Sequence, residues 1–178
     1  MVLQSLFAPR PARAAGEALY ASAARQARQP GFYADFGVPD TGEGRFELYC
    51  LHVSLILIRL KGEGAPAAET AQRLFDVFVR ALDDALREMG VGDLSVGKKM
   101  RKLGAAFYGR AQSCEAAILR LPDRAPLEAL LGRTALEDGG QDAAPALADY
   151  VVRAAEGLAA QPLEALLDGR VSWPESLR

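Results

Sequence analysis

Hydrophobic positions recur at helical rather than strand spacing along most of the chain. The clearest case is residues 66–89, where apolar residues follow one another at intervals of three and four. A second stripe of the same kind runs through residues 96–121. No window shows sustained alternation of apolar and polar residues, and β-branched residues are scarce, so strands find little support. The pattern predicts an all-α fold.

Helix breakers divide this pattern into a bundle of about six or seven helices. We expect a first helix over 14–28, ended by Pro30, and then an irregular aromatic loop. Asp40 and Glu43 have the spacing of a capping box, which predicts the start of a helix that continues through Leu60. This helix is apolar nearly all round, so we expect it at the centre of the core. The remaining helices are predicted over 66–89, 96–121, 126–137, 143–158 and 162–168.

The length and composition fit one globular domain. The chain has 178 residues, of which 50% are hydrophobic and 25% charged, so we expect a single helical domain over 1–178. The longest apolar run, from Leu48 to Ile58, is interrupted by His52 and falls far short of the roughly 20 residues that cross a bilayer. The first residues contain no uninterrupted apolar segment, so we expect no secretory signal.

Charge is distributed unevenly, although the net charge is only −2. Residues 90–121 carry six basic and two acidic side chains, whereas residues 122–178 carry ten acidic and five basic ones. The basic residues of the first segment fall mostly away from its apolar stripe. We interpret them as one basic face that could meet a partner; the alternative is an ordinary solvated helix face. This basic surface consists of Lys98, Lys99, Arg101 and Lys102.

One segment looks like a phosphate-binding loop. Gly92, Gly97 and Lys98 fit G-x-x-x-x-G-K, but Lys99 stands where the motif needs a serine or threonine hydroxyl for magnesium. The motif also needs a strand before the loop, and here an amphipathic helix precedes it. We expect these glycines to serve a tight helix-to-helix reversal, with Asp93 or Ser95 as the next helix cap.

The sequence offers equally little support for other catalytic or metal sites. His52 is the only histidine, and a single histidine in an apolar helix is usually a hydrogen-bonded core residue. Cys50 and Cys114 lie among apolar neighbours and predict buried, reduced thiols. The acidic pair Asp83 and Asp84 could bind a magnesium-diphosphate, but arginines at helical spacing explain it as ion pairs. We expect no catalytic residues, no metal and no cofactor.

Three longer segments resemble a known family. They are "FYADFGVPDTGEGRFEL" at 32–48, "LREMGVGDLSVGKKMRK" at 86–102 and "AAFYGR" at 105–110. In this order they resemble the ubiquinol-cytochrome c chaperone family, and the resemblance covers about residues 19–110. We expect a family-like core over about 19–121 and further helices over 122–178. The resemblance implies a helical, non-enzymatic assembly factor of the cytochrome bc1 complex.

The resemblance also implies partners. Mitochondrial relatives bind newly made cytochrome b, associate with the translating ribosome and work with a small partner protein. We therefore expect cytochrome b as the client, ribosome, small-partner or anionic-membrane contacts as further candidates, and no DNA. The short N-terminus favours the bacterial cytoplasm, at the inner face of the membrane; the alternative is the mitochondrial matrix side.

Apolar client helices need an apolar groove. We predict that Phe32, Tyr33 and Phe36 line it beside Phe107 and Tyr108, although core packing is the alternative use of these aromatic residues. Two other classes of protein stay open: a small helical lipid- or quinone-binding protein, and an enzyme that binds a diphosphate or nucleotide at Gly92–Lys98 or at Asp83 and Asp84.

Overall fold

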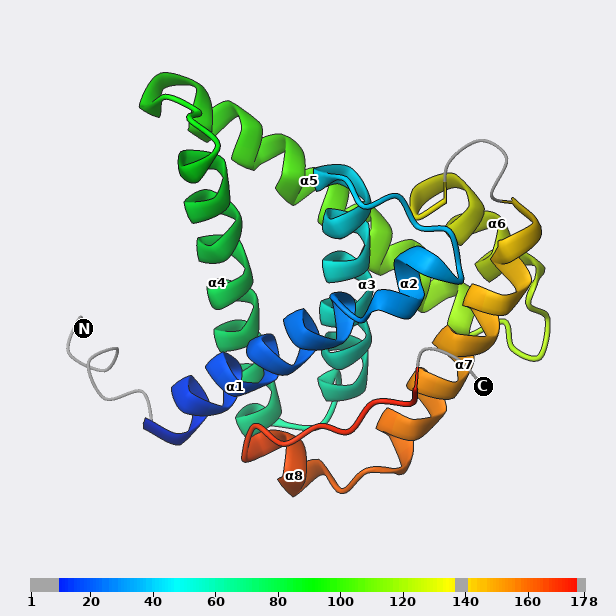
Figure 1. The fold of residues 1–178 in the computed structure, drawn as a ribbon. Coiled ribbons are helices and arrows are strands. Elements are labelled where there is room, and N and C mark those ends of the chain that lie inside the picture. The colour runs from blue at the N-terminus through cyan, green and yellow to red at the C-terminus, as the bar shows by residue number, and fades with distance from the viewer. Residues whose placement is uncertain (1–9, 137–140, 176–178) are drawn as a thin grey trace.

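A computed structural model describes residues 10–136 and 141–175, and over these residues the chain is helical with no strand. The all-α prediction is therefore confirmed (Figure 1). Eight α-helices and one short 3-10 helix fall within the described residues. They are α1 (Arg10–Ala27), α2 (Pro30–Ala34), α3 (Gly42–Leu60), α4 (Ala65–Glu88), α5 (Asp93–Ile118), α6 (Ala125–Thr134), η2 (Gln141–Ala143), α7 (Ala144–Ala160) and α8 (Leu163–Leu167).

Helix α3 lies at the centre of the molecule. It contacts α1, α4, α5 and α7, so it has neighbours on every side. Its apolar residues surround the helix axis, as the sequence predicts, and most of the helix is buried. A helix that is apolar all round can be stable only if other elements cover all of its surface. The other helices accordingly pack around α3 (Figure 1).

The core consists of two clusters that share α3. One cluster joins α3 to α2, α6 and α7, and includes Phe32, Leu127 and Tyr150. The other joins α3 to α1, α4, α5 and α8, and includes Leu19 and Phe78. Trp173, from the segment after α8, packs against both clusters. The segment around Trp173 therefore lies on the body of the protein.

A chain of hydrogen bonds crosses the core between these clusters. His52 is fully buried, and its Nδ1 lies 2.7 Å from the carbonyl oxygen of Leu48. A carbonyl can only accept, so Nδ1 carries the proton and Nε2 accepts from the Tyr150 hydroxyl, also at 2.7 Å. The Tyr150 oxygen in turn accepts from Gln26 Nε2 at 3.1 Å. The prediction of a hydrogen-bonded core histidine is confirmed.

The segment before α3 and the N-terminal cap of α3 both differ from the sequence prediction. The segment after Pro30 was expected to be irregular, but it begins with the short helix α2, because proline is compatible with the first helical turn. The cap of α3 is Thr41 rather than Asp40: the Thr41 hydroxyl accepts from the Gly44 backbone N–H at 3.1 Å. Asp40 is bound instead to Arg45.

Helices α4 and α5 form an arm: they meet at a turn that projects from the body and diverge from it (Figure 1). Gly90 has φ 79°, a left-handed conformation that glycine adopts most easily, and it follows the end of α4. Arg87 bridges the turn, because it binds Asp83 at 2.6 Å and Asp93 at 2.5 Å. Asp93 thus does not cap α5: the N-cap is Gly92, and no side chain caps the helix.

The arm confirms the interpretation of its sequence motif. The residues that imitate a phosphate-binding loop follow a helix instead of a strand, and Gly97 lies inside α5. Asp83 forms the expected intrahelical ion pair with Arg87. Both cysteines, Cys50 and Cys114, are buried free thiols, and burial raises the pKa of each. Within 10–136 and 141–175, no helix is long and apolar enough to cross a membrane.

Because His52 is buried, we predict that the folded protein loses stability in mild acid. Burial lowers the pKa of His52 from 6.5 to about 4, partly offset by its hydrogen bond to Leu48. Between pH 6.5 and pH 4 the unfolded chain therefore binds a proton at His52 that the folded chain does not. The free energy of unfolding should fall by up to about 3 kcal/mol over this range, and level off below it, for this residue alone.

Urea unfolding at a series of pH values measures this effect. His52→Gln keeps a side chain that can donate and accept hydrogen bonds but does not titrate. The variant should show a flatter dependence of unfolding free energy on pH between 6.5 and 4, whatever its absolute stability. Equal slopes for the two proteins would contradict the buried, neutral state of His52.

Candidate functional site

The aromatic residues at 32–36 lie mainly in the core. Phe32 and Phe36 are 0% and 2% exposed. The Phe32 ring packs edge-on against Tyr150 with 4.9 Å between ring centroids. Tyr33 is half-buried, and its hydroxyl donates to the Ala27 carbonyl oxygen at 2.9 Å. Phe32 and Phe36 therefore cannot touch a client in this conformation, because α7 and α3 already cover them.

The second aromatic pair lies elsewhere, in the cluster between α4 and α5. Phe107 is 2% exposed, whereas Tyr108 is 61% exposed. Both rings pack on Phe75, at centroid distances of 5.5 and 5.6 Å. The expected single groove lined by all five aromatic residues is thus not formed, since the two groups belong to different core clusters. Of the five, Tyr108 is the residue most available to a partner.

Tyr108 borders a groove between the C-terminal half of α3 and helices α4 and α5. Its volume is about 680 Å³. Its wall is largely apolar, and an ion pair between Lys61 and Glu115 at 2.5 Å lies at its edge. Such a concave apolar surface beside an exposed aromatic ring fits an apolar segment of a partner. The apolar lining includes Leu57, Ile58, Ala71, Phe75, Phe107 and Ala111.

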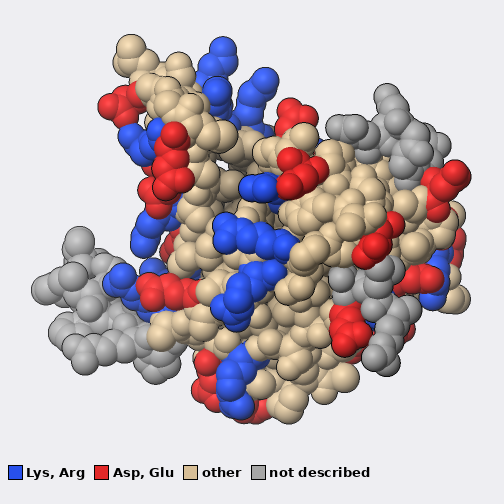
Figure 2. Space-filling view, viewed as in Figure 1, with Lys and Arg blue, Asp and Glu red and all other residues tan. Residues whose placement is uncertain are grey.

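The four residues of the predicted basic surface are all exposed on α5. None of them forms an ion pair within the described parts of the chain. In Figure 2, basic side chains gather at the top of the arm on the α5 side, whereas acidic and basic side chains are mixed along α4. The α5 side of the arm thus offers unpaired positive charge to a partner.

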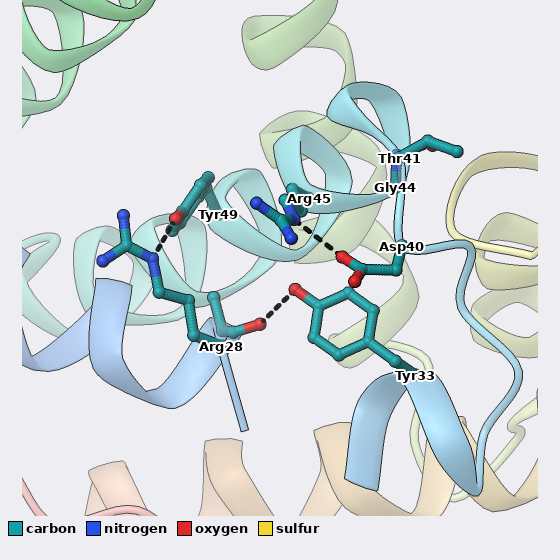
Figure 3. Close-up of polar contacts among 8 residues, drawn as sticks. Arg28, Tyr33, Asp40, Thr41, Gly44, Arg45 and Tyr49 are labelled. Carbon is teal, nitrogen blue, oxygen red and sulfur yellow. Dashed lines mark hydrogen bonds and ion pairs between the residues drawn. The ribbon is translucent and has the colours of Figure 1, made fainter. Parts of the chain in front are cut away.

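The signature segment at 32–48 forms a tight turn before α3 (Figure 3). Arg45 Nε donates to Asp40 at 2.7 Å, and this hydrogen bond lowers the pKa of the Asp40 carboxyl. At Gly44 a β-carbon would lie 2.1 Å from the carbonyl oxygen of Pro39, so only glycine fits without a backbone shift. The turn thus depends on "PDTGEGR" as a unit.

A second set of contacts ties this turn to the end of α1. Arg28 Nε donates to the Tyr49 hydroxyl at 2.6 Å, and its guanidinium lies 5.6 Å from the centre of that ring. The Tyr33 hydroxyl, bonded to Ala27, reaches the same end of α1 from α2 (Figure 3). Burial raises the pKa of Tyr33, so its hydroxyl stays a donor. These contacts position α2 between α1 and α3.

An ion pair joins the first and third signature segments. Arg110 of α5 binds Glu47 of α3 through both carboxylate oxygens, with Nε 2.8 and 2.7 Å away and Nη2 2.6 Å away. The Glu47 side chain is 9% exposed and that of Arg110 34%. A polar cavity of about 560 Å³ opens beside the pair between α3, α5 and α6. The pair fixes the distance between α3 and the arm.

Sequence reasoning missed this pair and the role of Tyr150. The signal for the pair is present, since Glu47 is an acidic residue inside an otherwise apolar helix. Buried carboxylates need a cationic partner, but the sequence does not say which arginine supplies it. Tyr150 has no comparable signal, because nothing in "ALADYVV" distinguishes a buried hydroxyl that meets His52.

Comparison with known proteins agrees with this structure. The model of the ubiquinol-cytochrome C chaperone family matches residues 34–173. This chain belongs to the ubiquinol-cytochrome c chaperone family. The match continues past residue 121 and includes the C-terminal helices. A search of curated proteins gives no match.

A solved structure of the Cbp3 homolog from Brucella abortus is also similar to this chaperone-family chain. The two chains are 37% identical and superpose with a TM-score of 0.84. The similarity covers 99% of this chain and 98% of the other. Both findings identify the chain as an assembly chaperone for ubiquinol-cytochrome c reductase, and no comparison supports a nucleotide, diphosphate, lipid or quinone site. The family segments mainly build the turn, the arm and the Glu47–Arg110 pair.

Loss of the Arg110 side chain should destabilise the fold. Arg110→Met leaves the Glu47 carboxylate nearly buried without a cation, at a cost of about 2 kcal/mol after allowance for the partial exposure of Arg110. The double variant Glu47→Gln/Arg110→Met should recover part of this loss, because no charge is then left unpaired. Urea unfolding followed by circular dichroism measures both.

The matched control is Arg45→Met, which breaks the exposed ion pair with Asp40. This variant should leave the urea midpoint nearly unchanged, because solvent screens an exposed pair. If Arg110→Met were no more destabilising than Arg45→Met, the Glu47–Arg110 pair would not hold α5 to α3.

Proposed function

We propose that this chain is a non-catalytic chaperone that binds newly made cytochrome b during assembly of the bc1 complex. The observation that carries the proposal is the apolar groove beside the exposed Tyr108, in a chain of the ubiquinol-cytochrome c chaperone family. Cytochrome b is the client expected from the family resemblance. As a membrane protein it exposes long apolar segments before it is inserted and folded.

The groove suits one face of an apolar helix. Aromatic and aliphatic side chains of α3, α4 and α5 line it, and a partner helix could place residues spaced by three and four against them. Each large apolar side chain that leaves water in such a groove contributes about 1.5–3 kcal/mol. The open shape of the surface favours a reversible hold, as a chaperone requires, over permanent burial.

Two residues that could have served enzyme chemistry have structural partners instead. Asp83 binds Arg87, and His52 is occupied by Leu48 and Tyr150. The lysine at position 98 lies on the exposed side of a helix rather than over a loop that could cradle phosphates. These contacts support a binding protein over the diphosphate or nucleotide enzyme considered from sequence.

We further propose that the chain works in the bacterial cytoplasm, at the inner face of the membrane. The similarity to a bacterial Cbp3 homolog supports this placement over the mitochondrial matrix. Ribosome contact and a small partner protein remain proposals that rest on mitochondrial relatives. DNA is not among the proposed partners, because the arm that carries the unpaired cations also carries acidic residues.

Site-directed photocrosslinking tests the client and its contact surface together. A benzoylphenylalanine replacing Tyr108 should preserve the fold, since the side chain is 61% exposed, and should crosslink to cytochrome b in native membranes. The same probe at Ala129, an exposed position on α6 away from the groove, serves as the control and should give little crosslinking. Mass spectrometry of the products identifies the client peptide.

Two outcomes count against the proposal. Crosslinks to cytochrome b from Ala129 but not from Tyr108 would reject the groove and keep the client. Absence of every bc1 subunit from both products, at a depth where abundant membrane proteins are detected, would reject cytochrome b as the client.

A further inference from the structure

The arm exposes large apolar side chains at its turn. Leu94 is fully exposed, at 102%, and Met89 is 68% exposed. Both lie within a few residues of the turn that projects from the body (Figure 1). Single exposed apolar residues are common on soluble proteins, so Leu94 alone says little. Its meaning comes from the residues that share its face of α5.

One face of α5 combines this apolar tip with positive charge and an aromatic ring. Leu94, Lys98, Arg101, Ala105 and Tyr108 follow one another at intervals of three and four, which places them on the same side of the helix. All five are exposed. From Leu94 to Tyr108 the face extends about 20 Å along the helix axis.

The opposite face of the helix is committed to the core. Val96, Phe107 and Cys114 are 6%, 2% and 3% exposed. Helix α5 is therefore amphipathic in an unusual sense: its outer face is not uniformly polar, but begins and ends with large exposed side chains. Lys102 flanks this face, and Lys99 lies further round the helix.

Most acidic side chains of the arm lie on α4. Within the described residues the four cations of the predicted basic surface have no ion-pair partner, whereas Asp83 and Asp93 are both bound to Arg87. Asp84 and Glu88, near the tip of the arm, also lie on α4. None of the five residues on the Leu94–Tyr108 face of α5 is acidic. An anionic surface can approach α5 without meeting the carboxylates first.

We propose that this face of α5 docks on an anionic lipid bilayer, with Leu94 and Met89 inserted at the level of the headgroups. The basic side chains would lie against anionic headgroups, and Tyr108 would lie in the interface, where tyrosine is favoured. RNA phosphates would also attract the cations, but they give no role to an exposed leucine at the tip. The apolar tip therefore favours the bilayer.

Docking in this way would bring the groove to the membrane. Tyr108 belongs both to the docking face and to the rim of the groove. A client segment that leaves or enters the bilayer would then meet the groove at the membrane surface. The docking proposal itself rests on α5 and the turn before it, and does not require that the groove binds cytochrome b.

Sedimentation of the full chain with lipid vesicles tests the proposal without any client. Vesicles of phosphatidylcholine with about one third phosphatidylglycerol should bind the protein, pure phosphatidylcholine vesicles should bind it weakly, and added salt should reduce the binding. Each basic side chain near the surface contributes about fivefold to partitioning, so removing four should reduce it by about 100-fold or more. The variant replaces Lys98, Lys99, Arg101 and Lys102 with glutamine.

A control variant changes the net charge by the same amount as the variant of the four α5 cations, but at sites spread over the protein. Its four arginines are exposed on other surfaces, and their replacement by glutamine should leave most of the vesicle binding intact. They are Arg25, Arg80, Arg120 and Arg170.

Two substitutions of one residue test insertion separately from charge. Leu94→Gln should weaken vesicle binding about tenfold, because the polar side chain no longer gains by entering the interface. Leu94→Met stays apolar and should bind like the unaltered protein. Since Leu94 is fully exposed, neither substitution should change the thermal unfolding temperature.

Three results would overturn the proposal. Equal binding to neutral and anionic vesicles would remove the role of the cations. Unchanged binding of Leu94→Gln would show that the tip does not insert. Binding of a labelled RNA duplex that depends on the four cations, with no binding to anionic vesicles, would assign the surface to nucleic acid instead.

Discussion

The hydrogen bond between His52 and Tyr150 holds the two halves of this protein together. His52 belongs to the central helix α3, and Tyr150 to α7, 98 residues later in the chain. Because both side chains are buried, each must find its partner inside the core or lose the free energy of hydration without compensation. Gln26 extends the chain of bonds to α1. This polar line specifies one arrangement of α1, α3 and α7 where apolar packing alone would tolerate several.

The body and the arm differ in how their apolar and charged side chains are placed. Around α3 the apolar residues are covered on all sides, and the charged pair Glu47–Arg110 fixes α5 at one point. Beyond that point α5 leaves the body, and its outer face carries cations without partners and exposed apolar side chains. Such residues contribute little to folding. Their placement on a rigid helix held at its base is what a contact surface for another molecule requires.

Each of the three family segments has an identifiable structural role in the body or the arm. The first forms the turn before α3, where Thr41 caps the helix and Gly44 packs directly on Pro39. The second forms the reversal of the arm and carries the exposed cations. The third supplies Arg110 for the pair with Glu47, and Tyr108 for the rim of the groove. Two of the three segments therefore combine a residue that positions the arm with residues that the arm presents.

The sequence by itself determined the helical class, most helix positions and the exposed cations of α5. Helical spacing of apolar residues is a local property, and it correctly assigned Phe107 to a buried stripe and Lys98 to the outer side. It also identified His52 as a core residue, because one histidine in an apolar helix has few other uses.

Only the tertiary structure decided which residues meet. The aromatic residues at 32–36 look like those of α5 in the sequence, yet α7 covers Phe32 while Tyr108 stays exposed. The partners of Glu47 and His52 lie 63 and 98 residues away, and a side chain's need for a partner does not reveal which distant residue supplies it. Burial and pairing depend on how helices pack against one another, and local spacing along a single chain does not encode that packing directly.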